Sequence, residues 1–135
     1  MKRNEHNKSV GSSIERTDDR INATSEVFTP IEICKKMVSE IPEEYLKDPK
    51  STFLDNAAGN GNFIVSLRDK LKEYHSEEHI LNKMLYAVEL MEDNHKEMCE
   101  RLGVPTDHKH YVHANALKYH YEFGEPAGVE NFYTN

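Results

Sequence analysis

The sequence contains no long apolar run and no recognisable signal sequence. A membrane-spanning helix needs roughly 20 consecutive apolar residues, so the sequence predicts a soluble, cytoplasmic protein. Cysteine is also scarce, because Cys34 and Cys99 are the only two and lie far apart in the chain, one on each of two predicted helices. A disulfide framework is therefore not expected, and both residues are predicted to be reduced, buried thiols.

Positive charge is in short supply. The 135 residues include 17 basic and 24 acidic side chains, for a net charge of -7. A surface that neutralises phosphates should be basic at least locally, so this balance argues against unaided binding of duplex DNA. Residues 1–24 are close to neutral and poor in apolar side chains, which is typical of a mobile polar arm. We expect one domain over residues 25–122 and a C-terminal tail over residues 123–135.

Apolar periodicity predicts alternating strands and helices between these ends. The expected strands cover residues 52–54, 85–89 and 110–114, and the expected helices cover residues 30–41, 62–74 and 92–102. Gly103 and Pro105 end the last helix. Residues 74–83 are interpreted as an extra polar connection, with a short helix or turn over residues 77–82. Strand, helix, strand, helix, strand is typical of a parallel sheet, so the predicted fold class is α/β.

The most informative segment is residues 53–63, FLDNAAGNGNF. An apolar pair leads into Asp55, and Gly59 and Gly61 then frame a turn that precedes an amphipathic run. A strand, a glycine turn and a helix N-terminus let the main chain approach a bound cofactor closely. The third glycine of a dinucleotide-binding G-x-G-x-x-G motif is missing, since Ile64 occupies its position.

Two further segments accompany this turn, Phe28-Thr29-Pro30 before it and Leu85 to Leu90 after it. Together the three segments resemble the N-6 DNA methylase group of N6-adenine DNA methyltransferases, found in restriction-modification systems and phages. That group has an F-T-P segment and a motif close to D-P-A-C-G-S-G-x-F, from which this chain departs at Asn56 and Ala58. The resemblance covers about residues 20–120. It implies half of a Rossmann-like class I methyltransferase fold, a parallel sheet flanked by helices, in a bacterial or phage-infected cell.

The resemblance also implies S-adenosylmethionine (SAM) as the cofactor. Glu89, closing its strand, is expected to accept both ribose hydroxyls, with Leu90 and Met91 packed on the adenine. Asp55 and the turn from Gly59 to Gly61 are expected to hold the methionine end together with Thr29. Asn115 is expected to accept from the adenine amino group, where the family more often has aspartate. The full set of expected cofactor-binding residues is Phe28, Thr29, Pro30, Asp55, Ala57, Gly59, Gly61, Phe63, Glu89, Leu90, Asn115 and Ala116.

Several of these residues have a local structural explanation as well. Asp55 could simply cap a turn between strand and helix, and Asn115 could be an ordinary turn residue. Thr29 and Pro30 fit the N-cap and first helical position of a helix, a role compatible with contact to a ligand. These alternatives stay open at the level of sequence.

The methyl-transfer motif of the family, N-P-P-Y or D-P-P-Y, does not occur here, since none of the five prolines is adjacent to another. That loop accepts from the target amino group and stacks on the flipped base. We therefore expect a SAM-binding domain whose methyl transfer needs an acceptor region supplied from elsewhere, and we assign no catalytic residue. The alternatives are an enzyme that hydrolyses or cleaves SAM, and a non-catalytic SAM-binding assembly module.

His75 to His79 fit the H-x-x-E-H pattern of inverted zinc proteases. Five residues in a polar stretch match by chance easily, and the chain is too short for that protease class. Solvated surface histidines are the simpler explanation, and no metal site is predicted.

The last expectation concerns partners. SAM or S-adenosylhomocysteine should bind, DNA only weakly without help, and a membrane not at all. The first strand should leave one sheet edge bare, which favours a homodimer or a partner subunit that covers it. Phe53, Phe132 and Tyr133 are the expected contacts.

Overall fold

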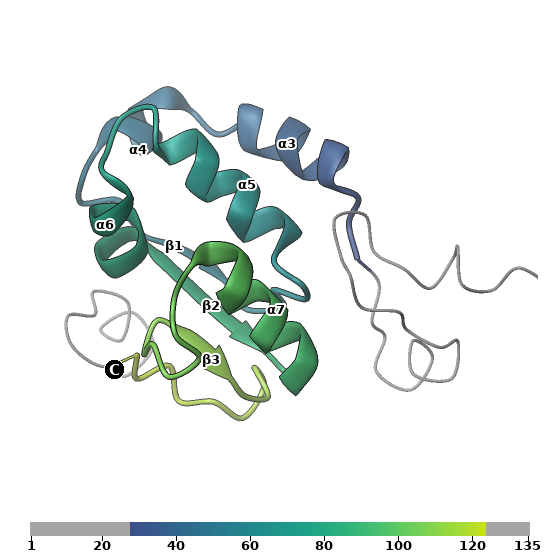
Figure 1. The fold of residues 1–135 in the computed structure, drawn as a ribbon. Helices are drawn as coiled ribbons and strands as arrows, with labels where there is room; N and C mark the ends of the chain where they lie inside the picture. The colour runs from purple at the N-terminus through teal and green to yellow at the C-terminus, as the bar shows by residue number, and fades with distance from the viewer. Residues whose placement is uncertain (1–27, 124–135) are drawn as a thin grey trace, which may run out of the picture.

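The computed structural model describes residues 28–123 (Figure 1). The predicted arm at residues 1–24 lies outside the described residues, and so does the tail from residue 124 onward. The elements follow one another as α3 (Ile31–Ser39), α4 (Glu43–Lys47), β1 (Phe53–Asp55), α5 (Asn62–Leu71), α6 (Glu77–His79), the π-helical turn η1 (Ile80–Met84), β2 (Leu85–Glu89), α7 (Glu92–Leu102) and β3 (Tyr111–His113).

The three strands form a parallel sheet in the order β1-β2-β3. Phe53 is opposite Leu85 in the first pair, and Ala87 is opposite Tyr111 in the second. Within the described part of the chain, β1 pairs only with β2 and therefore lies at an edge of the sheet. The predicted α/β class and parallel pairing are confirmed.

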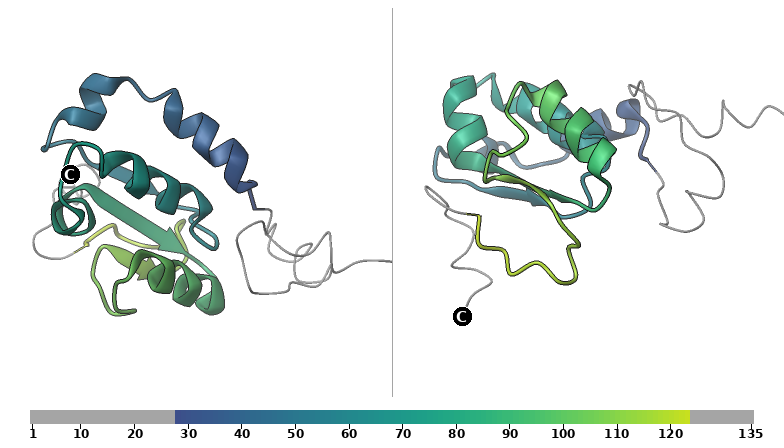
Figure 2. Two further views of the ribbon diagram at one scale, coloured as in Figure 1. Left: turned by 45° about the horizontal axis from the view of Figure 1, so that its top comes forward. Right: turned by 60° about the horizontal axis from the view of Figure 1, so that its bottom comes forward.

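Strand alternation sorts the side chains onto two faces of the sheet. Phe53, Leu85, Ala87 and Tyr111 point to the main core, which they share with the apolar faces of α5 and α7. Both helices therefore cover the same face, as the right panel of Figure 2 shows. This core holds most of the buried apolar side chains, so it accounts for most of the stability of the domain.

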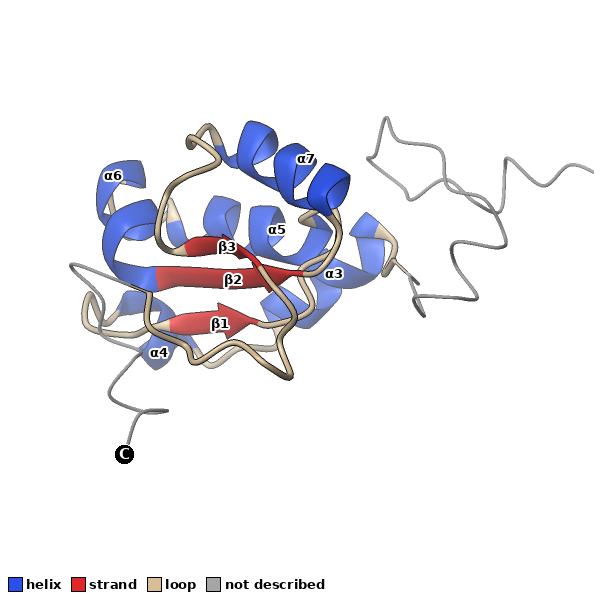
Figure 3. Cartoon of the chain, turned by 90° about the horizontal axis from the view of Figure 1, so that it is seen from below, coloured by secondary structure: helices blue, strands red, loops and turns tan. Residues whose placement is uncertain are grey.

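The opposite face has a smaller core. Tyr86 and Val88 lie there under the segment of residues 114–123, which crosses the strands as a loop (Figure 3). Phe123 is completely buried, and its ring centroid lies 5.1 Å from that of Tyr86 in an edge-on contact. This face is thus covered by aromatic side chains of a loop, among them Tyr119, and not by helices within the described residues.

The boundaries of β2 and α7 agree with the sequence prediction, and several others do not. The predicted N-cap role of Thr29 is wrong, because α3 begins at Ile31 and Pro30 occupies the cap position. The carbonyl of Pro30 accepts the first helical hydrogen bonds, from the main-chain N–H groups of Ile33 and Cys34, each at 3.0 Å.

One element between the predicted ones was missed, and another was found in a different environment. The helix α4 was not expected at all, and it is held by the buried side chain of Leu46. The short helix or turn expected after α5 is present as α6 and η1. The connection is nevertheless less polar than predicted, since Ile80, Leu81 and Met84 are buried in the main core. α5 ends at Leu71, three residues before the predicted boundary.

The two histidines of the H-x-x-E-H pattern have structural partners. Nε2 of His75 lies 2.7 Å from the carbonyl oxygen of Leu46, and Nε2 of His79 lies 2.8 Å from that of Pro49. The rings therefore tie α4 and the segment that follows it to α6 and the residues just before it. Among residues 28–123, no three metal-ligating side chains gather at one point. Cys34 and Cys99 are free, buried thiols, as predicted.

No helix within residues 28–123 is long and apolar enough to span a bilayer.

Candidate functional site

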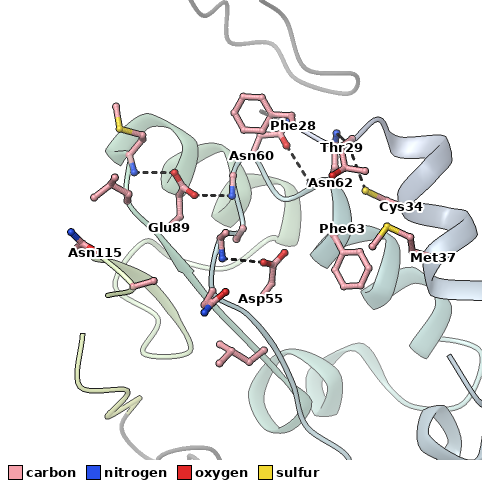
Figure 4. Close-up of a pocket in the computed structure, with 18 residues that line it drawn as sticks. Phe28, Thr29, Cys34, Met37, Asp55, Asn60, Asn62, Phe63, Glu89 and Asn115 are labelled. Carbon is pink, nitrogen blue, oxygen red and sulfur yellow. Dashed lines mark hydrogen bonds between the residues drawn. The ribbon is translucent and has the colours of Figure 1, made fainter. Parts of the chain in front are cut away.

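A cleft of about 510 Å³ opens at the carboxyl ends of β1 and β2, beside the start of α3 (Figure 4). Parallel sheets commonly bind ligands at this end of their strands. Every predicted site residue lines the cleft except Pro30 and Gly61. The complete lining is Phe28, Thr29, Cys34, Met37, Leu54, Asp55, Asn56, Ala57, Ala58, Gly59, Asn60, Asn62, Phe63, Glu89, Leu90, Met91, Asn115 and Ala116.

The two glycines of the turn have different roles. Both adopt positive φ angles, 56° at Gly59 and 93° at Gly61, which side-chain-bearing residues rarely adopt. A Cβ atom on Gly59 would lie 2.7 Å from the Phe28 ring, so Gly59 lets that ring pack on the turn. A Cβ atom on Gly61 would lie 3.3 Å from the Cα of Met98 in α7. Gly61 therefore permits close packing of the turn on α7 and does not face the cleft.

Glu89 connects the glycine turn to the start of α7 at the base of the cleft. Its side chain is only 7% exposed, and its Oε1 accepts from the main-chain N–H of Gly59 at 2.7 Å. Its Oε2 accepts from the main-chain N–H of Met91 at 2.9 Å and from the amide of Asn94 at 3.3 Å. Since a carboxylate offers about four acceptor positions, three protein donors leave one on Oε1. Glu89 thus fixes the glycine turn and the start of α7 in addition to any contact with a ligand.

Asp55 is the less engaged of the two carboxylates in the cleft. Within the described residues, its Oδ1 accepts one hydrogen bond, from the main-chain N–H of Ala57 at 3.1 Å. Burial raises the pKa of Asp55, and the negative charge of Glu89 raises it further. A positively charged group that enters the cleft would stabilise the ionised form of Asp55 against both effects. Asp55 is therefore the residue best placed to attract a cation.

The wall above the glycine turn is formed by the segment Phe28-Thr29-Pro30. The carbonyl oxygen of Thr29 accepts from the side-chain amide of Asn62 at 2.9 Å and from the thiol of Cys34 at 3.6 Å. The segment is therefore attached both to α5 and to α3. The side chain of Thr29 is exposed at the cleft.

Asn115 lies at the other end of the cleft, after β3. Its Oδ1 accepts from the main-chain N–H of Leu117 at 3.0 Å, and its carbonyl oxygen accepts from the N–H groups of Lys118 and Tyr119, each at 2.9 Å. Asn115 therefore caps a tight turn, which was the alternative explanation from sequence. An amide oxygen has two acceptor positions, so Oδ1 retains one beside the Leu117 N–H, and Nδ2 supplies donors at the same end of the cleft.

Sequence reasoning missed part of the lining. Cys34 was expected only as a buried thiol, and Met37 was not expected at the site, yet both line the cleft and Met37 is 47% exposed there. Asn60 and Asn62 alternate with the two glycines, a pattern that could have drawn attention to them as polar supports of the turn. Leu54, Asn56 and Ala58 complete the lining that was not predicted.

Comparison with known families gives an independent result. A sequence model of the family described as N-6 DNA methylase matches residues 17–119, which include all the predicted site residues. The chain belongs to the N-6 DNA methylase family. Comparison with curated proteins finds no match. Family membership agrees with the three-stranded parallel sheet, which corresponds to part of a methyltransferase fold, and it identifies an N6-adenine DNA methyltransferase-like domain. SAM is the methyl donor that this family generally uses.

Proposed function

We propose that this domain binds SAM in the cleft at the carboxyl ends of β1 and β2. The observation that carries the proposal is the pair of carboxylates, Asp55 and Glu89, facing one cleft beside a glycine turn in an N-6 DNA methylase domain. The methionine end of SAM would lie near Asp55 and Thr29, and the ribose near Glu89. The adenine would lie between Leu90 and Ala116.

Charge supports this orientation. The sulfonium and the ammonium group of SAM are both positive, and Asp55 has acceptor positions to spare. Two unit charges about 4 Å apart attract by about 4 kcal/mol at an effective dielectric constant of about 20. Glu89 has a single acceptor position left, on Oε1, and we propose that one ribose hydroxyl donates to it. The second hydroxyl would bind Glu89 only if one of the three protein donors moved away from the carboxylate. Asn115 would accept from the adenine amino group through the remaining position on Oδ1 and offer its Nδ2 to a ring nitrogen.

We further propose that the chain supplies the cofactor half of a methyltransferase. Its sequence has no N-P-P-Y or D-P-P-Y tetrapeptide to hold a flipped adenine, so positioning of the target amine would come from another polypeptide segment. A prokaryotic restriction-modification system or a phage is the proposed setting. The net charge of -7 agrees with dependence on a partner for DNA binding.

Incubation of the pure protein with SAM, with and without DNA of mixed sequence, tests this proposal. We expect mass spectrometry to show intact SAM and unmethylated adenine when this chain is alone. Methyl transfer to adenine by the chain alone would contradict the need for a supplied acceptor region. Release of methylthioadenosine or homoserine-type products would instead support a SAM-degrading enzyme.

A second polypeptide covering the β1 edge is also part of the proposal. Within the described residues β1 has one strand neighbour, and a loop covers the sheet face opposite the helices. An open strand edge beside a thinly covered face favours strand addition. The partner would be another copy of the chain or a different subunit, with Phe53 at the contact. The other predicted contacts, Phe132 and Tyr133, lie outside the described residues.

Light scattering at micromolar concentration, together with hydrogen exchange, tests the assembly. We expect a particle larger than a monomer, or a monomer whose β1 amides exchange quickly until a partner is added. A clean monomer with protected β1 amides would show that the chain covers its own edge.

A further inference from the structure

Arg101 lies outside the cleft yet contacts the glycine turn from its far side. This residue comes from the last turn of α7, and its Nη1 donates to the carbonyl oxygen of Asn60 at 3.0 Å and to Oδ1 of Asn62 at 2.8 Å. Both acceptors belong to residues that are at most 3% exposed. A guanidinium has only donors, so it dictates that an oxygen faces it at each of these two positions.

This constraint fixes the orientation of the Asn62 amide. Because Oδ1 faces Arg101, Nδ2 must point the other way, where it donates to the carbonyl oxygen of Thr29 at 2.9 Å. Asn62 also has its main-chain oxygen bonded to the hydroxyl of Ser66 at 2.8 Å. An asparagine is needed here, since its side chain must accept on one side and donate on the other.

The Thr29 carbonyl is the point at which this chain of contacts reaches the wall of the cleft. Phe28, the residue before it, packs its ring on Gly59, and the thiol of Cys34 lies 3.6 Å from the same carbonyl oxygen. Figure 4 shows Phe28, Thr29, Asn62 and Cys34 together at one end of the cleft, away from Asn115. The contacts run from α7 through the start of α5 to the segment of residues 28–30.

We propose that Arg101 and Asn62 are positioning residues that hold residues 28–30 against the glycine turn and so shape the methionine end of the SAM site. This inference rests on the proposed function. Arg101 does not line the cleft itself, so it acts through the two cleft-lining residues that it contacts, Asn62 and the main chain of Asn60.

We call the two contacts, Arg101 to Asn62 and Asn62 to the Thr29 carbonyl, the relay. Loss of the relay leaves the adenosine end of the site, built around Glu89 and Asn115, in place.

The decisive variant is Asn62→Asp. Aspartate keeps the acceptor that faces Arg101, with added charge, but places an oxygen against the Thr29 carbonyl where the amide donated. We expect SAM and S-adenosylhomocysteine to bind about tenfold more weakly or worse, by loss of that hydrogen bond. Methylthioadenosine has no amino-acid end, so its affinity should change less than twofold. A general loss of structure would weaken all three ligands alike.

Arg101→Met provides a second variant and a coupling measurement. Alone it should weaken SAM binding several-fold. In an Asn62→Ala background, which already lacks the amide that joins Arg101 to Thr29, it should add little. The matched control is Arg68→Met, since Arg68 in α5 donates to the carbonyl oxygens of Arg101 and Leu102, each at 3.4 Å, away from the cleft. It should leave SAM affinity unchanged.

The outcomes separate this inference from the proposed function. If the unmodified protein binds neither SAM nor methylthioadenosine, the proposed function fails. If it binds both, and folded Asn62→Asp and Arg101→Met proteins bind SAM as the unmodified protein does, the positioning role is wrong. Equal weakening of SAM and methylthioadenosine would also overturn it, and additive effects in the double variant would show that Arg101 does not act through Asn62.

Discussion

The Asp55→Asn variant should bind SAM about tenfold to a hundredfold more weakly than the unmodified protein, and yet unfold at a higher temperature without ligand. The first effect follows because a charged acceptor contributes about 1.5–3 kcal/mol to a hydrogen-bonded pair. The second follows because partial burial and the negative charge of Glu89 both raise the pKa of the Asp55 carboxyl. Asparagine keeps the size and the acceptor for the Ala57 N–H but removes the charge.

Stability and SAM affinity should depend on pH in opposite directions. The folded protein holds a proton on Asp55 at a higher pH than the unfolded chain does. The contribution of Asp55 to stability therefore grows as the pH falls and is lost as the pH rises through the folded pKa. SAM binding runs the other way, since the cation needs the ionised carboxylate. Affinity should fall as the pH is lowered through that pKa, and Asp55→Asn should remove this dependence.

Asp48→Asn is the matched control. Asp48 also accepts from the main-chain N–H two residues ahead, that of Lys50 at 2.9 Å, but it is exposed and lies away from the cleft. It should change neither the affinity nor its pH profile. Calorimetric titrations and thermal melts, repeated from acidic to neutral pH, measure both effects. Unchanged SAM affinity in Asp55→Asn would remove Asp55 from the site.

Glu89→Ala should produce the largest combined effect on stability and binding. The change leaves three donors without their acceptor, the main-chain N–H groups of Gly59 and Met91 and the amide of Asn94. A buried donor that loses its partner costs about 1–3 kcal/mol, so we expect a loss of unfolding free energy of at least about 2 kcal/mol. SAM affinity should fall up to about a hundredfold, because the ribose acceptor and the shape of the turn are lost together.

Glu89→Gln separates the contribution of the three hydrogen bonds from that of side-chain size, because glutamine has nearly the same shape as glutamate. Its amide nitrogen would face either the Gly59 N–H or the donors of Met91 and Asn94, so one donor is left opposite another donor. We expect Glu89→Gln to be destabilised almost as strongly as Glu89→Ala. Glu92→Ala, at the exposed start of α7, should be neutral. Urea unfolding measures the stability, and Glu89→Gln with unchanged stability would show that the three hydrogen bonds contribute little.

The elements that sequence analysis located best are those fixed by local signals. β2 is an apolar run closed by Glu89, and all five of its residues are buried. α7 ends at Leu102, and Gly103 caps it with a positive φ that suits glycine. The element that was missed depends on distant contacts, because α4 has only five residues and is anchored by the buried side chain of Leu46. The helical turn η1 falls within the expected short helix or turn, but its burial through Ile80 and Met84 was not expected. Local propensity is too weak to predict elements of this length.

The same distinction applies to the site. Asp55, Gly59 and Glu89 could be predicted because each belongs to a short motif at the end of a strand. The role of Gly61 in packing on α7 could not be predicted, nor could the contact of Arg101 with Asn62, which joins residues 39 positions apart. Contacts of that kind exist only after the helices have packed, and no local pattern encodes them.

Calorimetric titration of the folded protein with SAM, repeated with S-adenosylhomocysteine, tests the central claim most directly. We expect saturable binding at one site per chain with a micromolar dissociation constant, equivalent to about −8 kcal/mol, and competition between the two ligands. No heat and no competition at millimolar ligand, with a sample whose cooperative melting shows that it is folded, would contradict a SAM site in this cleft.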